Sequence, residues 1–217
     1  MKKLIVLAGL LFALFCFPAL AHASTPSGIP FSELEQVVDD IAAEYVGTST
    51  AGAQIAIVQN GEVLLSKSYG YADIERQILV DNDTVFEWGS ASKTFVWVSV
   101  MQLVEQGKLD LNADIRGYLP DDFFRRLQFD APITMYNLMN HNAGWEDYPF
   151  DLMVSSPGDV LSLEASLRRA EPLQIYEPGW VVAYSNFGAA LAGYIVERVT
   201  GQPFYAYVNE HILRCWE

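Results

Sequence analysis

Residues 86–95 read FEWGSASKTF, an extended segment that turns into a helical pattern ending near Gln106. Ser90 lies at the predicted helix N-terminus, where the helix dipole stabilises negative charge on a serine oxygen. Lys93 follows one turn along the same helix face, within reach of that oxygen, where it can accept the serine proton. The pattern therefore predicts a serine nucleophile assisted by a lysine. The alternative is that Ser90 only caps the helix while Lys93 points to solvent.

A second candidate motif, Tyr184-Ser185-Asn186, follows a predicted turn and precedes a predicted helix. A tyrosine can serve as general acid or base, and an asparagine two residues later can bind an amide of a substrate. The same spacing recurs at Tyr207 and Asn209, but inside an amphipathic helix pattern, where the tyrosine reads as a packing residue and the asparagine as a surface residue. Because loop side chains can face a cleft, the first copy favours Tyr184 as catalytic and Asn186 as substrate-binding.

Three further residues are weaker candidates for the site. His141 invites a Ser-His-Asp interpretation with Ser90, but no sequence feature pairs the two, and a histidine at a helix end more often caps the helix. Trp145 and Tyr148 follow closely and could line a substrate cleft. The alternative is that these two aromatic residues are half-buried on the surface.

The rest of the pattern predicts a mixed fold. The predicted elements, in chain order, are a helix over 33–46, strands over 53–59 and 62–69, an extended piece over 84–87, and helices from Ser90, from Thr134 to near 142–144, over 186–199 and from Pro203 to Leu213. Ser32 and Glu35 form a capping box for the first helix, and Asn60-Gly61 is the strongest two-residue hairpin turn. Since a two-stranded hairpin is not a stable sheet, it must pack against helices or pair with further strands.

The first 23 residues have the features of a secretory signal peptide. Two lysines precede an apolar run over residues 4–17, and small residues stand at positions 21 and 23, where a signal peptidase reads them. The run is shorter than the roughly 20 residues of a membrane span. We therefore expect an exported protein, periplasmic, in the cell envelope or extracellular, with a short tether over 24–31. The alternative is an uncleaved N-terminal anchor.

Composition and charge narrow the class of function. The 217-residue chain is 51% hydrophobic with a net charge of −14, and cleavage of the signal would leave 11 of its 13 basic residues against all 27 acidic ones. An acidic surface repels nucleic acid and anionic membranes, so we expect a small-molecule or peptide substrate and no membrane span after cleavage. The remaining histidines and cysteine have no metal-site spacing, so no metal or other cofactor is expected. No feature indicates an oligomeric state.

Taken in order, several segments resemble the serine hydrolase family that contains class C β-lactamases, D-alanyl-D-alanine carboxypeptidases and related esterases. They are FEWGSASKTF at 86–95, LDLN at 109–112, ITMYNLMNHNAG at 133–144, PG at 178–179, YSN at 184–186 and VTG at 199–201. Together they extend over nearly all of residues 32–213. Their joint order is far more specific than either short motif.

The resemblance implies an α/β (α+β) fold of the β-lactamase/transpeptidase type, with the N-terminal helix and the hairpin in its sheet layer. It also implies an acyl-enzyme mechanism on an amide, lactam or ester bond. In that mechanism Ser90 attacks, Lys93 and Tyr184 share the proton transfers, and Asn186 orients the substrate. The tyrosine in the second motif points to the class C-like branch.

The chain departs from this family in one respect. Relatives carry a third motif, Lys-Thr-Gly or His-x-Gly, on a strand well after the second motif, and that strand supplies an oxyanion N–H. Here the residues after Asn186 have a helical pattern. We therefore expect residues 32–217 to be a hydrolase domain without its C-terminal strands, in which activity is lowered or lost. The competing function is a non-catalytic, penicillin-binding-like envelope protein that binds peptidoglycan peptides in the same cleft.

Overall fold

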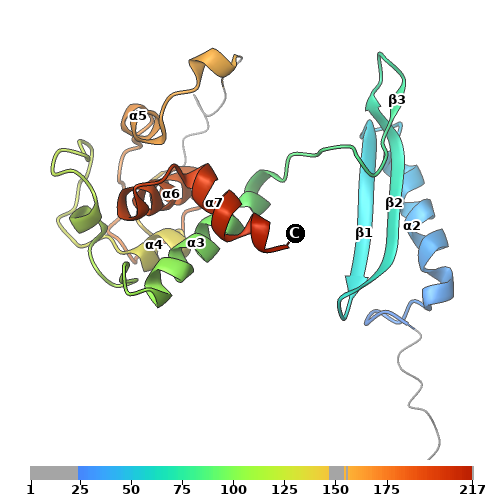
Figure 1. The fold of residues 1–217 in the computed structure, drawn as a ribbon, viewed down its shortest axis with the longest axis horizontal. Coiled ribbons are helices and arrows are strands. Elements are labelled where there is room, and N and C mark those ends of the chain that lie inside the picture. Colours follow the sequence, from blue (N-terminus) through green and yellow to red (C-terminus); the bar gives the residue numbers. More distant parts are fainter. Residues whose placement is uncertain (1–23, 147–153, 155, 217) are drawn as a thin grey trace, which may run out of the picture. The chain divides into compact units, whose positions relative to one another are not determined.

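The computed structural model describes residues 24–146, 154 and 156–216 (Figure 1). Contacts divide the chain into two compact units, with the boundary between Glu87 and Trp88. The predicted signal peptide lies outside the described residues, and the predicted division into a tether and a hydrolase domain stays a prediction. The serine, lysine, tyrosine and asparagine of the two motifs all lie in the second unit.

The first unit consists of one helix and a small antiparallel sheet. Its elements are α2 (Phe31–Tyr45), β1 (Gly52–Gln59), β2 (Glu62–Asp73) and β3 (Ile78–Leu79), with the strands in the order β1-β2-β3. The predicted hairpin is confirmed, because β1 and β2 pair around Asn60 and Gly61. The φ angles of these two residues, 53° and 81°, are the two positive values that a type I′ turn requires.

α2 packs against β2 through an apolar stripe and an ionic cluster. The buried side chains of α2 are Leu34, Val38 and Ala42. At the polar edge, Lys67 Nζ on β2 lies 2.6 Å from Asp39 Oδ1 and 2.8 Å from Glu35 Oε1. The Tyr69 hydroxyl also donates to Asp39, at 2.7 Å. The hydrogen bonds from Lys67 and then from Tyr69 hold the pKa of the Asp39 carboxyl below its ordinary value.

One local prediction in this unit was wrong, and one short strand was not predicted. The helix begins directly after Pro30, whose carbonyl oxygen accepts the Glu33 N–H, so Ser32 lies inside the first turn and forms no capping box. β3 was not predicted because two residues show no periodicity. The segment over residues 84–87, predicted as an extended piece, has no regular secondary structure.

The second unit is built around helix α6. In chain order its helices are α3 (Lys93–Glu105), α4 (Met135–Met139), α5 (Leu163–Arg169), α6 (Asn186–Thr200) and α7 (Phe204–His211). The middle of α6 is buried on nearly every side, and α3, α4, α5 and α7 all pack against it (Figure 1). A helix that is apolar all round requires such a central position.

The helix ends in this unit follow signals that the sequence carries. α6 begins after Ser185, whose Oγ accepts the Gly188 N–H at 3.0 Å, and ends at Gly201 with a left-handed φ of 73°. α4 begins with a capping box between Thr134 and Asn137 and has ended before residue 142, as predicted. α5 was not predicted, because its seven residues are too few for a clear helical period.

Two buried polar side chains hold the long loops of this unit in place. The Glu171 carboxylate accepts the backbone N–H groups of residues 125–126, each at 2.9 Å. The Gln174 side chain accepts the Gln128 N–H at 3.2 Å and donates to the Ala143 carbonyl at 3.1 Å. Buried backbone groups need such partners, so these bonds tie three loops together.

Trp145 is a core residue, so both predictions for it were wrong. Its side chain is 1% exposed, and its ring packs against those of Phe124 and Phe187 with centroids 5.9 and 5.0 Å apart. Gly144, directly before it, accepts two backbone N–H groups from the segment that leads to α6, which draws this loop into the core. Tyr148, the other predicted cleft residue, lies outside the described residues.

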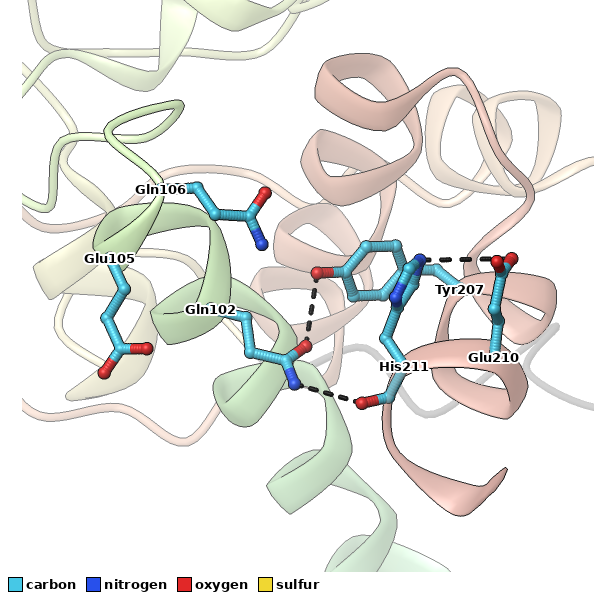
Figure 2. A pocket seen from close by; sticks show the side chains of 6 residues that line it. All are labelled: Gln102, Glu105, Gln106, Tyr207, Glu210 and His211. Atoms are coloured by element: carbon cyan, nitrogen blue, oxygen red, sulfur yellow. Dashed lines mark hydrogen bonds and ion pairs between the residues drawn. The ribbon is translucent and has the colours of Figure 1, made fainter. Parts of the chain in front are cut away.

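Polar contacts join α3 to α7 (Figure 2). The Tyr207 hydroxyl donates to Gln102 Oε1 at 3.2 Å, and Gln102 Nε2 donates to the His211 carbonyl at 3.1 Å. Tyr207 is buried and Asn209 is exposed, which confirms the interpretation of this second tyrosine–asparagine pair as packing and surface residues. A pocket of about 270 Å³ lies beside these contacts.

Neither a membrane span nor a metal cluster occurs among the residues that the structure describes. Within residues 24–146, 154 and 156–216, none of the helices combines the length and the hydrophobicity of a membrane-crossing segment. In the same part of the chain, no three histidine, cysteine, aspartate or glutamate side chains are grouped as metal ligands would be.

Candidate active site

Ser90 lies in a 3₁₀ turn that leads directly into α3. The turn spans Gly89–Ser92, and α3 continues from Lys93 without a break. Gly89 has a left-handed φ of 52°, a conformation that costs other residues about 1–2 kcal/mol. The turn leaves the Ser90 side chain exposed at the helix N-terminus, whereas Lys93 is half-buried. The predicted nucleophile is therefore accessible to a substrate.

Two side chains donate hydrogen bonds to the Ser90 hydroxyl oxygen. Lys93 Nζ lies 3.0 Å from Ser90 Oγ, and the Tyr184 hydroxyl lies 2.8 Å from it. Lys93 Nζ also donates to Asn186 Oδ1 at 2.8 Å. The structure thus brings together all four residues that the two motifs singled out, at distances that permit direct proton transfer to and from the serine.

The start of α6 presents the second motif to the first. Ser185 is buried and caps the helix, while its neighbours Tyr184 and Asn186 contact the serine and the lysine. Capping fixes the backbone of this junction, because the Ser185 side chain cannot rotate without breaking its bond to the helix. The predicted loop-to-helix position of this motif is confirmed.

Lys93 lies at the centre of the site. Its Nζ lies 4.9 Å from the centroid of the Tyr184 ring, a distance at which a cation is attracted to an aromatic face. The same Nζ is in contact with Ser90 Oγ. Lys93 Nζ therefore contacts both the serine hydroxyl and the face of the tyrosine ring.

A pocket of about 250 Å³ opens beside the polar residues. Lys93 and Asn186 form part of its wall, and the rest is mostly small or apolar. The remaining wall residues include Val96, Leu163, Ala189, Ala190, Gly193 and Phe204. The pocket therefore has room for an apolar group beside Lys93 and Asn186.

His141 lies against Tyr184 and Ser185. Its ring centroid is 4.4 Å from that of Tyr184, and its Nδ1 accepts the Ser185 N–H at 3.2 Å. Sequence reasoning missed this arrangement, because the histidine lies more than forty positions before its partners and no local pattern links them. The Ser-His-Asp interpretation is not supported, since lysine and tyrosine donate to Ser90 Oγ and Nδ1 is engaged by a backbone amide.

Comparison with known proteins gives consistent matches. The sequence profile of the family described as Beta-lactamase matches residues 38–217. Protein flp of Staphylococcus aureus (strain MW2) is 29% identical over 164 residues, which are 75% of this chain and 33% of that protein. The structure of the octameric penicillin-binding protein homologue from Pyrococcus abyssi is 28% identical with a TM-score of 0.69, over 84% of this chain and 42% of that one. EstCE1, described as a hydrolase with promiscuous acyltransferase activity, is 27% identical with a TM-score of 0.71, over 85% and 51%.

These matches settle the class of fold. Both solved structures superpose on more than four fifths of this chain, which confirms the predicted mixed helix-and-sheet architecture. The chain spans about a third of the Staphylococcus aureus protein and about half of the EstCE1 chain.

Proposed function

Because the chain belongs to the β-lactamase family, whose members are serine hydrolases, we propose that it acts through an acyl-enzyme formed on Ser90. The observation that carries the proposal is the pair of hydrogen bonds to Ser90 Oγ, from Lys93 Nζ at 3.0 Å and from the Tyr184 hydroxyl at 2.8 Å. A serine is a weak nucleophile until a neighbouring group takes its proton, and this pair can do so.

The first half-reaction is acylation. Ser90 Oγ forms a bond to the carbonyl carbon of the substrate, its proton passes to the Lys93–Tyr184 pair, and the carbonyl oxygen takes the electron pair of the opened double bond. When this intermediate collapses, the bond from carbon to the leaving nitrogen or oxygen breaks. The leaving group receives a proton from the same pair, while Asn186 orients the part of the substrate that remains.

The second half-reaction is hydrolysis of the acyl-enzyme. A water oxygen forms a bond to the acyl carbon and gives a proton to the Lys93–Tyr184 pair. The bond from the acyl carbon to Ser90 Oγ then breaks, Ser90 recovers its proton, and the substrate is released as a carboxylic acid. Every proton is accounted for by one serine, one lysine, one tyrosine and water.

We propose an amide, a lactam or a small ester as the scissile group, and a peptidoglycan-type peptide, a β-lactam or a simple ester as the substrate. The names of the two similar structures support this range, since one is a penicillin-binding protein homologue and the other a hydrolase with acyltransferase activity. The apolar pocket beside Lys93 and Asn186 offers a place for an aliphatic or aromatic substituent. We also propose export, on the basis of the signal-like sequence of residues 1–23.

A fluorescent fluorophosphonate, which labels activated serines, tests the proposal. The parent chain and Ser92→Ala, a control in the same turn, are expected to be labelled, and Ser90→Ala is not. A folded parent that takes up no label, or equal labelling of Ser90→Ala, would refute the acyl-enzyme. The first result would favour the non-catalytic envelope protein, which a thermal-shift titration with a D-alanyl-D-alanine peptide then detects as ligand binding. Fluorescent penicillin in parallel shows whether β-lactams are among the substrates.

A further inference from the structure

His141 contacts the segment that leads into α6 and contains the second motif. Its Nδ1 accepts the Ser185 N–H at 3.2 Å, and its ring lies on that of Tyr184 with centroids 4.4 Å apart and planes inclined by 31°. Its own carbonyl oxygen accepts the Ala183 N–H at 2.7 Å. One residue therefore contacts three consecutive residues, 183 to 185, and the middle one is Tyr184.

The backbone of His141 is held in a conformation that needs support. Its φ of 53° is left-handed, which is uncommon for a residue other than glycine and marks a position where the surroundings fix the chain. The support comes from α4: the His141 N–H donates to the Leu138 carbonyl at 3.2 Å. The Asn137 side chain donates to the Asn142 side chain at 3.1 Å, and the Asn142 N–H donates to the Asn137 carbonyl at 2.9 Å.

The histidine ring also connects Tyr184 to the helix of the nucleophile. The His141 ring lies nearly perpendicular to that of Trp97 on α3, with centroids 6.4 Å apart. Trp97 lies one turn after Lys93 on the same helix. The His141 ring thus lies between a ring on α3 and the ring of Tyr184.

From this geometry we infer that His141 is a positioning residue, which sets the Tyr184 hydroxyl at 2.8 Å from Ser90 Oγ. The inference rests on the proposed function. Tyr184 is 46% exposed, so packing by the core alone does not fix its ring. The hydrogen bond from Ser185 fixes the backbone beside it, and the imidazole ring in contact with it restricts rotation of its side chain. Displacement of a catalytic group by about 1 Å can cost about 10²-fold in rate.

Three substitutions separate the contacts that His141 makes. His141→Asn keeps an acceptor near the position of Nδ1 and tolerates a left-handed φ, but it has no ring. His141→Phe keeps a ring but offers no acceptor for the Ser185 N–H. His141→Ala removes both. Thermal unfolding and circular dichroism of each variant show whether it is folded before any rate is compared.

The measured quantities are the maximal rate and the half-saturating concentration of Ser90 labelling by the fluorophosphonate. His141→Ala and His141→Phe are expected to lower the maximal rate by about 10- to 10²-fold, with the half-saturating concentration within about twofold of the parent, and His141→Asn to recover a large part of the rate. A merely structural role would instead reduce the labelled fraction without changing the rate of the folded protein. Parent rates in the alanine and phenylalanine variants would overturn the inference. Equal rates in His141→Asn and His141→Ala would also overturn it, because the acceptor for the Ser185 N–H would then make no contribution to the rate. If His141→Ala does not fold, the rates of His141→Phe and His141→Asn test the inference.

Should the parent not be labelled, the proposed function fails while this inference stays testable. In protein labelled with ¹³C at the tyrosine Cζ, Tyr184→Phe identifies the Tyr184 signal by its disappearance. Ser90→Ala removes the acceptor of the Tyr184 hydroxyl and is expected to shift that signal. Positioning by His141 predicts a shift of similar size and the same direction in His141→Ala, whereas an unmoved signal would overturn it.

Discussion

Removal of one hydroxyl group tests how the proton leaves Ser90. Tyr184→Phe deletes the group that lies 2.8 Å from Ser90 Oγ and keeps the ring that contacts Lys93 and His141. General acid–base catalysis contributes about 10²- to 10⁴-fold to a rate. Because Lys93 Nζ stays at 3.0 Å from the serine oxygen, we expect the lower end, a loss of about 10²-fold or about 2.7 kcal/mol in activation free energy.

Stability is expected to change little in the same variant. The lost hydrogen bond joins two exposed side chains, so its net contribution to folding is at most about 1 kcal/mol, which corresponds to less than about 4 °C in Tm for a chain of this size. The assay is the second-order rate constant of fluorophosphonate labelling, with Tyr205→Phe, an exposed tyrosine of α7, as the matched control. A Tyr184→Phe rate within about threefold of the parent, in protein that still requires Ser90, would refute the shared proton transfer.

Two predictions concern stability. Gly144→Ala would drive a Cβ into the Tyr176 carbonyl oxygen at a φ of 88°, so we expect a loss of about 3 kcal/mol or more and a fall in Tm of about 6–12 °C by calorimetry. Asp39 pairs with Lys67, and its pKa in the folded state lies below the ordinary 3.8. The stability from this pairing is therefore present above that pH and is lost as the pH falls through the lower, folded-state pKa. Asp39→Asn is expected to reduce the fall of Tm that the parent shows between about pH 5 and pH 3.

Matched substitutions check both results. Gly179 has a φ of 90°, but no atom lies within 4 Å of the point that an added Cβ would occupy, so Gly179→Ala should suffer from backbone strain alone and lose about 1–2 kcal/mol. Equal losses at positions 144 and 179 would contradict the steric explanation. Asp40→Asn removes the same charge from α2 without touching Lys67, and should leave the acid dependence of the parent unchanged.

Local elements were predictable where local chemistry decides them. The turn at Asn60-Gly61 formed because these two residues accept positive φ at little cost, and α6 ended where Gly201 allows a left-handed cap. The predicted capping box at Ser32 did not form, because the helix already begins after Pro30. α5 and β3 were missed, since short elements owe their existence to the surfaces that they pack against.

The sequence by itself determined which residues can do chemistry: a serine with a lysine one helical turn later, and a tyrosine and an asparagine at a second helix start. Helical periodicity and capping act over a few residues, so both motifs and the helices that contain them could be predicted from the sequence alone. Only the tertiary structure brought Tyr184 to Ser90, buried Trp145 and set His141 against the second motif. Those placements come from the packing of α3, α4 and α6 and from hydrogen bonds between distant loops, and no short-range pattern records them.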